Sequence, residues 1–374
     1  MSATKVPTPT LVGLALMAVV AYAVAERSVE PVHARAYRMK THAVALMQRA
    51  ERAIGAAKKE RGITSDPRND PDGTGLLGPQ FSLITTDRGV QAAKALAAHP
   101  NFAAAVTQML LEAGVGSGDL VAVGMTGSLP GLNLAVFSAC RAIGAEPIVL
   151  TSVGSSMFGA NDPEMTWLDM EQISIAAGLW PYRTLGASFG GGGDVGRGLS
   201  PQGRQLLLDA IRRAGAIHLD APNVFEAVKA RVALYDSTAA ARGKPIRAYV
   251  NVGGGVASLG GAQNARLVPA GLTRRLAARN YPNRGVLNVL AERRIPVIQL
   301  LEVERLAAAY SIVDPETGAT PKPGKGLLFI RHRYNLWIVA LAALLVLLAN
   351  VFVLRLDLRH QVLGRPHPER RRIP

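Results

Sequence analysis

The chain has 374 residues, enough for one large or two ordinary domains, and 49% of them are hydrophobic while only 18% are charged. This balance and a positive mean hydropathy exclude an intrinsically disordered chain and disfavour a wholly soluble one, so we expect membrane segments. The net charge of +15 favours an anionic partner, and a single cysteine excludes an internal disulfide framework and any CxxC zinc or redox motif.

The first apolar segment runs from Thr10 to Ala25, sixteen residues without a charge. It is short for a membrane span, and the Ala-Val-Ala sequence at residues 23–25 is typical of a processing site. An uncleaved signal anchor, a cleaved signal peptide and a buried core helix are the three alternatives. We expect residues 1–25 to form an uncleaved anchor, a transmembrane helix, because an uncharged segment so near the N-terminus disfavours a core helix.

Residues 26–80 are predicted to contain one long helix and a linker. Apolar residues recur at intervals of three and four between Val32 and Arg61, which is the helical period. Such a helix forms either a stalk or a layer packed on the following domain, and packing on the domain is the simpler interpretation. Residues 64–80 are rich in proline, glycine and aspartate, which indicates a connector.

An α/β domain is predicted for residues 81–313, because short apolar runs alternate there with segments of helical period. This alternation indicates a mostly parallel sheet with flanking helices. The predicted strands are 120–124, 147–153, 183–185, 216–219, 248–252 and 296–301, and the predicted helices are 88–98, 101–114, 130–143, 200–214, 222–242 and 286–294.

The C-terminal part consists of a predicted linker (314–335), an uncharged segment (336–354) and a basic tail (355–374). A helix over the uncharged segment is about 28 Å long, the thickness of a bilayer hydrocarbon core. Arginine and aromatic residues at its ends are typical interfacial anchors. We therefore expect a cell-membrane protein with the lipid bilayer as a partner, two transmembrane helices and both termini on one side. The signal-like N-terminus favours an extracytoplasmic central domain.

Four glycine-rich segments follow predicted strands. The first, Gly-Met-Thr-Gly-Ser-Leu-Pro-Gly at residues 124–131, lies between a strand and a helix, where free peptide N–H groups attract anions. It does not have the spacing of a phosphate-binding GxxxxGK[ST] loop, a GxGxxG loop or a GxSxG nucleophile elbow. A tight turn with a capping hydroxyl is the alternative for this segment.

The other three segments lie at residues 151–171, 188–200 and 248–261. Because the carboxyl ends of parallel strands share one edge of a sheet, we expect all four segments to surround one ligand site. A capped helix start is the alternative for residues 161–171. The predicted ligand-binding residues are Thr126, Gly127, Ser128, Ser155, Ser156, Asn161, Asp169, Gly193, Asp194, Asn251, Gly253, Gly254 and Ser258.

Catalytic residues are harder to assign from the sequence. Ser128, His218 and either Asp194 or Asp220 can be drawn as a nucleophile, a base and an acid, but such residues recur by chance in a chain of this length. Cys140 lies in an apolar helical segment and reads as a buried side chain rather than a nucleophile. The seven histidines show no metal-binding spacing, so neither a metal nor a cofactor is predicted.

The four segments, in order, resemble the bacterial poly-gamma-glutamate system protein family. The matching sequences are GDLVAVGMTGSLPGLN (118–133), GANDPEMTWLDME (159–171), SFGGGGDVGRGLS (188–200) and AYVNVGGGVASLGG (248–261). The resemblance covers about residues 80–305. It implies a membrane protein that accompanies the synthesis and export of poly-gamma-glutamate, with the subunits of that complex as partners. It assigns no catalytic residue, and it implies that the ligase step belongs to another, nucleotide-binding component.

Three hypotheses for the function follow. The first is an accessory, non-ligase membrane protein that binds an anionic polymer or ligand at the glycine-rich loops. The second is a membrane-anchored hydrolase or transferase acting on gamma-glutamyl or phosphosugar-like substrates, with Ser128 as the first nucleophile to test. The third is a scaffold for other membrane subunits.

Segments 1–25 and 336–374 carry net charges of +1 and +4, which leaves +10 for residues 26–335. A nucleic-acid partner is disfavoured, because only 5% of the residues are aromatic and no recognition motif occurs.

Overall fold

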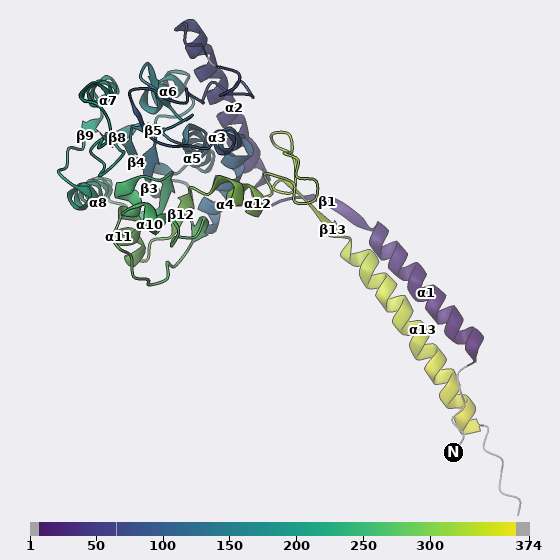
Figure 1. Ribbon diagram of the computed structural model, residues 1–374. Coiled ribbons are helices and arrows are strands. Elements are labelled where there is room, and N and C mark those ends of the chain that lie inside the picture. Colours follow the sequence, from purple (N-terminus) through teal and green to yellow (C-terminus); the bar gives the residue numbers. More distant parts are fainter. Residues whose placement is uncertain (1–6, 65, 364–374) are drawn as a thin grey trace, which may run out of the picture. The chain divides into compact units, whose positions relative to one another are not determined.

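The computed structural model describes residues 7–64 and 66–363, with side chains as far as Leu356 (Figure 1). The chain divides into two compact units. One, the α/β unit, is Ala34–Phe329. The other, the terminal unit, combines the residues up to His33 with those from Ile330 onward.

The α/β unit is built on one seven-stranded sheet. Its spatial order is β11 (Gly271–Thr273), β12 (Val297–Leu300), β10 (Ile246–Val252), β3 (Leu120–Thr126), β4 (Glu146–Ser152), β8 (Thr184–Ser188) and β9 (Ile217–His218). Neighbouring strands are parallel except β11 and β12, which are antiparallel. The predicted mostly parallel sheet is therefore confirmed. All seven residues of β3 are buried, as expected for a central strand covered on both faces.

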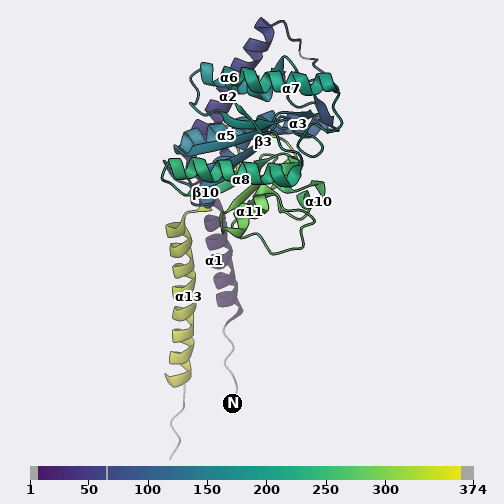
Figure 2. The ribbon, with the colours of Figure 1, turned by 90° about the vertical axis from the view of Figure 1, so that its left-hand side faces the viewer.

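Helices cover both faces of this sheet, as Figure 2 shows for α2, α5 and α6 on one face and α8 and α11 on the other. The first layer contains α2 (Tyr37–Glu60), α3 (Gln91–Ala97), α4 (Asn101–Glu112), α5 (Pro130–Ile143), α6 (Trp167–Ala176) and α7 (Pro201–Arg213). The second contains α8 (Val224–Ala241), α9 (Val256–Leu259), α10 (Ala262–Ala265) and α11 (Val286–Glu292), while α12 (Val303–Ala309) packs against α3.

The chain reverses its direction across the sheet between β3 and β10. From β3 it proceeds through β4 and β8 to the edge strand β9, and α8 then carries it back to β10, on the other side of β3. The loops that follow β3 and β10 therefore leave in opposite directions. In open α/β sheets such a switch point opens a crevice at the carboxyl ends of the strands, where ligands bind.

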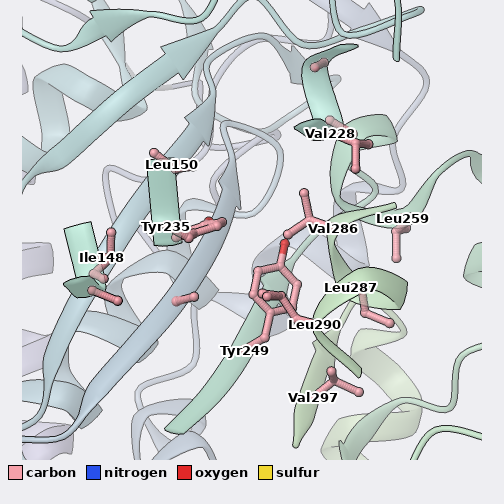
Figure 3. Packing of buried hydrophobic residues seen from close by; sticks show 14 of the residues in the cluster. Ile148, Leu150, Val228, Tyr235, Tyr249, Leu259, Val286, Leu287, Leu290 and Val297 are labelled. Carbon is pink, nitrogen blue, oxygen red and sulfur yellow. The ribbon is translucent and has the colours of Figure 1, made fainter. Parts of the chain in front are cut away.

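A hydrophobic cluster holds α8 and α11 against the sheet (Figure 3). Tyr235 of α8 and Tyr249 of β10 are fully buried and meet edge to face, with ring centroids 6.1 Å apart. The Tyr235 hydroxyl donates a hydrogen bond to the Val123 carbonyl, and the Tyr249 hydroxyl pairs with Ser258 Oγ. Both polar ends of this apolar cluster are thus satisfied, and β3 and β10 are fixed beside each other.

The long helix α2 is a layer of the α/β unit and not a stalk. Its buried face includes Ala43, Met47, Ala50 and Ile54, which repeat at helical spacing, and it packs on α4 and α5. The buried Lys40 donates a hydrogen bond from Nζ to Gln108 Oε1 at 2.7 Å. Of the two alternatives for the predicted helix, packing on the domain is the one observed.

Two pairs of very short strands complete the unit. One pair is parallel, β2 (Thr85–Asp87) with β5 (Ser155–Ser156), and the other is antiparallel, β6 (Asn161–Asp162) with β7 (Met165–Thr166). None of these two- and three-residue strands was predicted, because they are shorter than any period that a sequence pattern can establish.

The terminal unit consists of two apolar helices and a two-stranded ribbon. Helix α1 (Thr8–Arg27) packs beside α13 (Leu336–Leu363), and β1 (Val29–His33) pairs antiparallel with β13 (Ile330–Tyr334), from Val29 opposite Tyr334 to His33 opposite Ile330. Helix α1 and residues 336–356 of α13 are each long and apolar enough to cross a membrane. The predicted linker 314–335 thus contains a strand. Residues 1–6 of the predicted anchor and 364–374 of the predicted basic tail lie outside the described residues.

Candidate functional site

A cavity of about 610 Å³ lies at the carboxyl edge of the sheet, at the switch point between β3 and β10. We call it the switch cavity. Its lining comes from the β2–α3 segment, from the ends of β3, β4 and β10, and from the start of α12. The loop between β8 and α7 (residues 189–200), which we call the glycine loop, completes it. Segments separated by more than two hundred residues therefore meet here, as the sheet topology requires.

Hydroxyl groups line the floor of the switch cavity, among them Thr126, Ser152 and Ser156. Thr126 is 6% exposed, and its Oγ1 has no hydrogen-bond partner within the described residues. A buried hydroxyl without a partner costs about 1–3 kcal/mol, so an occupant that hydrogen-bonds Thr126 Oγ1 would recover that free energy. This orphaned group points to a polar ligand.

The β10 loop reaches Thr126 only because position 253 is a glycine. Gly253 has a φ of +86°, and a Cβ at this position would lie 2.3 Å from Thr126 Oγ1. Any side chain would therefore displace either the loop or the hydroxyl, in addition to the strain of the left-handed backbone. The glycine after β10 brings the main chain close to the cavity floor.

Lys94 of α3 enters the switch cavity from the side and is 7% exposed. Its Nζ donates to the Ser128 carbonyl and lies 2.7 Å from Ser156 Oγ. Burial of the ammonium group lowers the pKa of Lys94 to about 8, since no carboxylate compensates for the lost hydration. Ser128 Oγ in turn accepts a hydrogen bond from the Ser156 N–H at 3.0 Å. Lys94 thus ties the loop after β3 to the loop after β4.

Two further cations line the switch cavity, the exposed Arg88 and Arg197. Neither guanidinium group forms an ion pair or hydrogen bond with the described residues, whereas the nearby Arg231 is paired with Asp194. The peptide nitrogens of Ser128, Gly254 and Gly255 also donate no hydrogen bond within the described chain. Unpaired cations and free peptide N–H groups at one opening are suited to an anion.

A buried ion pair supports the cavity from behind. Arg231 of α8 and Asp194 of the glycine loop are each 4% exposed, with Arg231 Nη2 3.0 Å from Asp194 Oδ2. The hydroxyls of Ser152 and Ser188 donate to Asp194 Oδ1 at 2.8 and 2.9 Å. Asp194 adopts φ +65°, so the network holds the glycine loop in a strained backbone conformation next to the strand ends.

A second hollow of about 1110 Å³, the α8 groove, adjoins the switch cavity and shares Arg197 and Val256 with it. It runs between α8 and residues 281–284, and its walls include the exposed Phe225 and the half-buried Val232 and Tyr281. Together the two hollows have five basic and two acidic lining residues: Arg88, Lys94, Arg197, Lys229 and Arg284 against Asp87 and Asp236.

Five of the predicted site residues line the switch cavity together, and a sixth lines the α8 groove. The five are Thr126, Ser128, Ser156, Gly253 and Gly254, and the sixth is Gly193. The structure places the other seven outside both linings. These are Gly127, Ser155, Asn161, Asp169, Asp194, Asn251 and Ser258.

Residues outside the linings hold the site's framework. Asn161 is buried and donates from Nδ2 to the Pro79 carbonyl and Thr85 Oγ1, which fixes the segment before β2. Asp169 forms a capping box with Thr166 at the start of α6, so the capped-helix alternative describes this position. Asn251 Nδ2 lies 2.5 Å from Gln299 Oε1 on the neighbouring strand.

Gly127 and Ser155 also lie outside the linings, and both donate hydrogen bonds to backbone carbonyl groups. The Gly127 N–H donates to the Ser152 carbonyl at 3.0 Å, and a Cβ there would lie 2.4 Å from the Val153 carbonyl oxygen. Ser155 is fully buried and donates from Oγ to the Ser156 carbonyl at 2.8 Å. Both residues shape the loops that carry Ser128 and Ser156.

The proposed grouping of Ser128, His218 and Asp194 is not assembled. The His218 ring packs at a tilt against Phe189, with ring centroids 4.8 Å apart, and within the described residues it forms no hydrogen bond with Ser128 or Asp194. Asp194 is bonded to Ser152, Ser188 and Arg231. Cys140 is fully buried in α5, and burial raises the pKa of its thiol to about 12, so the thiolate is scarce near neutral pH.

The sequence did not point to Lys94, Arg88, Arg197 or Arg231. A sequence signal for Lys94 and Arg88 does exist, in the segment Thr-Thr-Asp-Arg-Gly at residues 85–89. This segment leads from a strand to a helix, as the first glycine-rich segment does. Arg231 has no such signal, because only the packing of α8 on the sheet brings it to Asp194. Within the described residues, no group of three or more histidine, cysteine or acidic side chains is placed to hold a metal ion.

Comparisons with protein-family models, with curated proteins and with solved structures found no match to this chain.

Proposed function

We propose that this chain is a membrane-anchored accessory, non-ligase protein of poly-gamma-glutamate biosynthesis or export, and that its α/β unit binds a carboxylate of the polymer or another anionic ligand in the switch cavity. One observation carries the proposal. The unpaired guanidinium groups of Arg88 and Arg197 and the orphaned hydroxyl of Thr126 surround one cavity at the switch point of the sheet.

The size and charge of the site favour an extended polyanion over a single small ion. The switch cavity continues through Arg197 into the longer α8 groove, and basic residues outnumber acidic ones along both. A gamma-linked glutamyl chain carries one carboxylate per residue on an otherwise uncharged backbone. A binding surface for such a chain needs cations at intervals, with apolar side chains between them. The walls of the two hollows have this composition. The resemblance of the four glycine-rich segments supports the same ligand class.

Binding is tested with the full chain in nanodiscs of neutral lipid, titrated calorimetrically with a poly-gamma-glutamate oligomer. Because a hydrogen bond to a charged group contributes about 1.5–3 kcal/mol, Arg197→Gln is expected to weaken binding about 10- to 100-fold. Binding should also weaken as salt is raised. Arg266→Gln is the matched control, since Arg266 is exposed and lines neither hollow. Equal affinities for Arg197→Gln and Arg266→Gln would contradict the assignment.

The membrane arrangement is tested separately. We propose that α1 and residues 336–356 span the bilayer as an antiparallel pair and that the α/β unit is extracytoplasmic. Cys140 is fully buried, so a cysteine introduced at the exposed Ala319 gives the signal in Ala319→Cys. We expect a membrane-impermeant maleimide to label Ala319→Cys in intact cells and to leave the parent chain unlabelled. Labelling only after the cells are lysed would place the α/β unit on the other side.

A further inference from the structure

The switch cavity contains a serine and a lysine in direct contact. Ser156 Oγ lies 2.7 Å from Lys94 Nζ, and the two side chains, 9% and 7% exposed, both line the cavity. Ser156 Oγ has no other hydrogen-bond partner within the described chain. We propose that Ser156 is a nucleophile and Lys94 its general base, so that the site cleaves or transfers an acyl group of an amide or ester that carries a carboxylate.

The surroundings of Lys94 suit a base. The Ser128 carbonyl accepts a hydrogen bond from Nζ and thereby orients the amine, which leaves its lone pair free for the Ser156 hydroxyl when the amine is neutral. Burial lowers the lysine pKa to about 8, so an appreciable neutral fraction exists near neutral pH. Besides Lys94, the charged residues that line the cavity are Asp87, Arg88 and Arg197. The two helices packed on α3 add Glu304 and Arg305 from α12 and Arg141 from α5.

Ser156 is better placed than Ser128 for this chemistry. Ser128 Oγ accepts the Ser156 N–H, and Lys94 contacts the carbonyl of Ser128 and not its hydroxyl. The unpaired N–H of Ser128 and the unpaired hydroxyl of Thr126 remain as donors for a developing oxyanion. The nucleophile comes from β5, the base from α3, and the oxyanion donors from the end of β3 and the loop after it, and these segments meet at the switch point.

The reaction balances with water as the only co-reactant. Ser156 Oγ attacks the carbonyl carbon while its proton moves to neutral Lys94, and the tetrahedral intermediate then expels the amine or alcohol, which takes that proton. Water next attacks the Ser156 ester and gives one proton to Lys94. Collapse of this second intermediate releases the acid and returns the proton to Ser156. In a transferase reaction, an amine takes the place of water.

The test uses a small, uncharged serine reagent, phenylmethylsulfonyl fluoride, on the full chain in nanodiscs. Adducts are located and timed by peptide mass spectrometry over about two pH units on either side of the lysine pKa of about 8. We expect an adduct at Ser156 whose rate of formation rises about tenfold per pH unit below that pKa and levels off above it. Ser156→Ala should lose the adduct, and Lys94→Met should slow it about 100-fold or more and remove the pH dependence.

Controls separate chemistry from folding. Lys59→Met and Ser237→Ala change exposed residues outside the cavity and should leave the labelling rate unchanged. Ser156→Cys keeps the shape of the site, and its alkylation by iodoacetamide should show the same dependence on Lys94. Absence of a Ser156 adduct in the folded chain, or an identical rate and pH profile in Lys94→Met, would overturn the proposal.

This inference takes its substrate class from the proposed anion site, but the reagent carries no charge and reports the nucleophile alone. A poly-gamma-glutamate oligomer should slow the labelling of Ser156 by occupying the cavity. Labelling without protection would support the serine–lysine pair and contradict the proposed ligand. Calorimetric binding of the oligomer without any labelling would retain the proposed function and overturn the catalytic pair.

Discussion

Arg231→Met is expected to lower the free energy of unfolding of the α/β unit by about 3–5 kcal/mol, the cost of leaving one member of a buried ion pair alone. Asp194 would keep its charge at 4% exposure, with only the Ser152 and Ser188 hydroxyls to compensate for lost hydration. The glycine loop would also lose its tie to α8. Arg231 Nη2 donates to Ser188 Oγ at 2.7 Å and to Ser152 Oγ at 3.1 Å, so three partners are released by one substitution.

Urea unfolding of the full chain in detergent, followed by the fluorescence of the buried Trp167 and Trp180, measures this loss. Arg293→Met is the matched control. Arg293 binds both carboxylate oxygens of Asp236, at 2.6 and 3.0 Å, but both side chains are more than 40% exposed, so its loss should cost at most about 1 kcal/mol. Arg231→Met with Asp194→Asn should recover part of the stability by removing the unpaired charge. Equal losses in Arg231→Met and Arg293→Met would show that the buried pair is dispensable.

Glu51→Gln is expected to raise the free energy of unfolding by about 3 kcal/mol at pH 7, while at pH 4 the substituted and parent chains should differ little. Burial raises the pKa of Glu51 from 4.5 to about 8, and Oε1 of this carboxyl has no hydrogen-bond partner within the described residues. The folded chain therefore holds a proton on Glu51 that the unfolded chain releases above its ordinary pKa. This difference lowers stability as pH rises from about 4.5 to about 8, and the amide removes it.

The pH dependence is measured with the same urea assay at several pH values. Glu171 contributes in the same direction, because burial raises its pKa to about 7 against the hydrogen bonds from the Thr184 N–H and hydroxyl. Glu51→Gln should therefore reduce the pH slope without removing it. Glu60→Gln, at the exposed end of the same helix, is the control. A slope unchanged by Glu51→Gln would mean that this carboxyl titrates alike in the folded and unfolded chain.

The strands and helices of the α/β unit could largely be predicted from local pattern. The helix predicted over 130–143 has those bounds, because Pro130 starts it and Gly144, at φ +82°, ends it. The order of the strands could not be predicted, since parallel neighbours are chosen by packing between distant segments. The edge strand β11 has only three residues, Gly271–Thr273, and is recognisable only from its pairing with β12.

The residues of the candidate site could be predicted where the backbone places them at the end of a strand, but not where burial by distant segments places them. Glycines and hydroxyl-bearing residues after predicted strands identified five lining residues, Thr126, Ser128, Ser156, Gly253 and Gly254. Lys94 lies in a short helix where a lysine is normally solvated. It is buried because α3 packs closely on α5, where a Cβ on Gly131 would lie 2.4 Å from the Ala97 carbonyl oxygen. No local pattern reports such a contact between helices.

The pairing of β1 with β13 has a consequence for how the chain is made. The two ends of the α/β unit meet, with the Ala34 N–H bonded to the Phe329 carbonyl at 2.8 Å, and the ribbon continues from His33 opposite Ile330. Because β13 follows the α/β unit along the chain, a ribosome must synthesise that whole unit before β1 can pair with β13. Residues 34–329 are therefore an insertion between two paired strands. An unrelated domain whose ends lie side by side could replace this insertion without lengthening either strand of the ribbon.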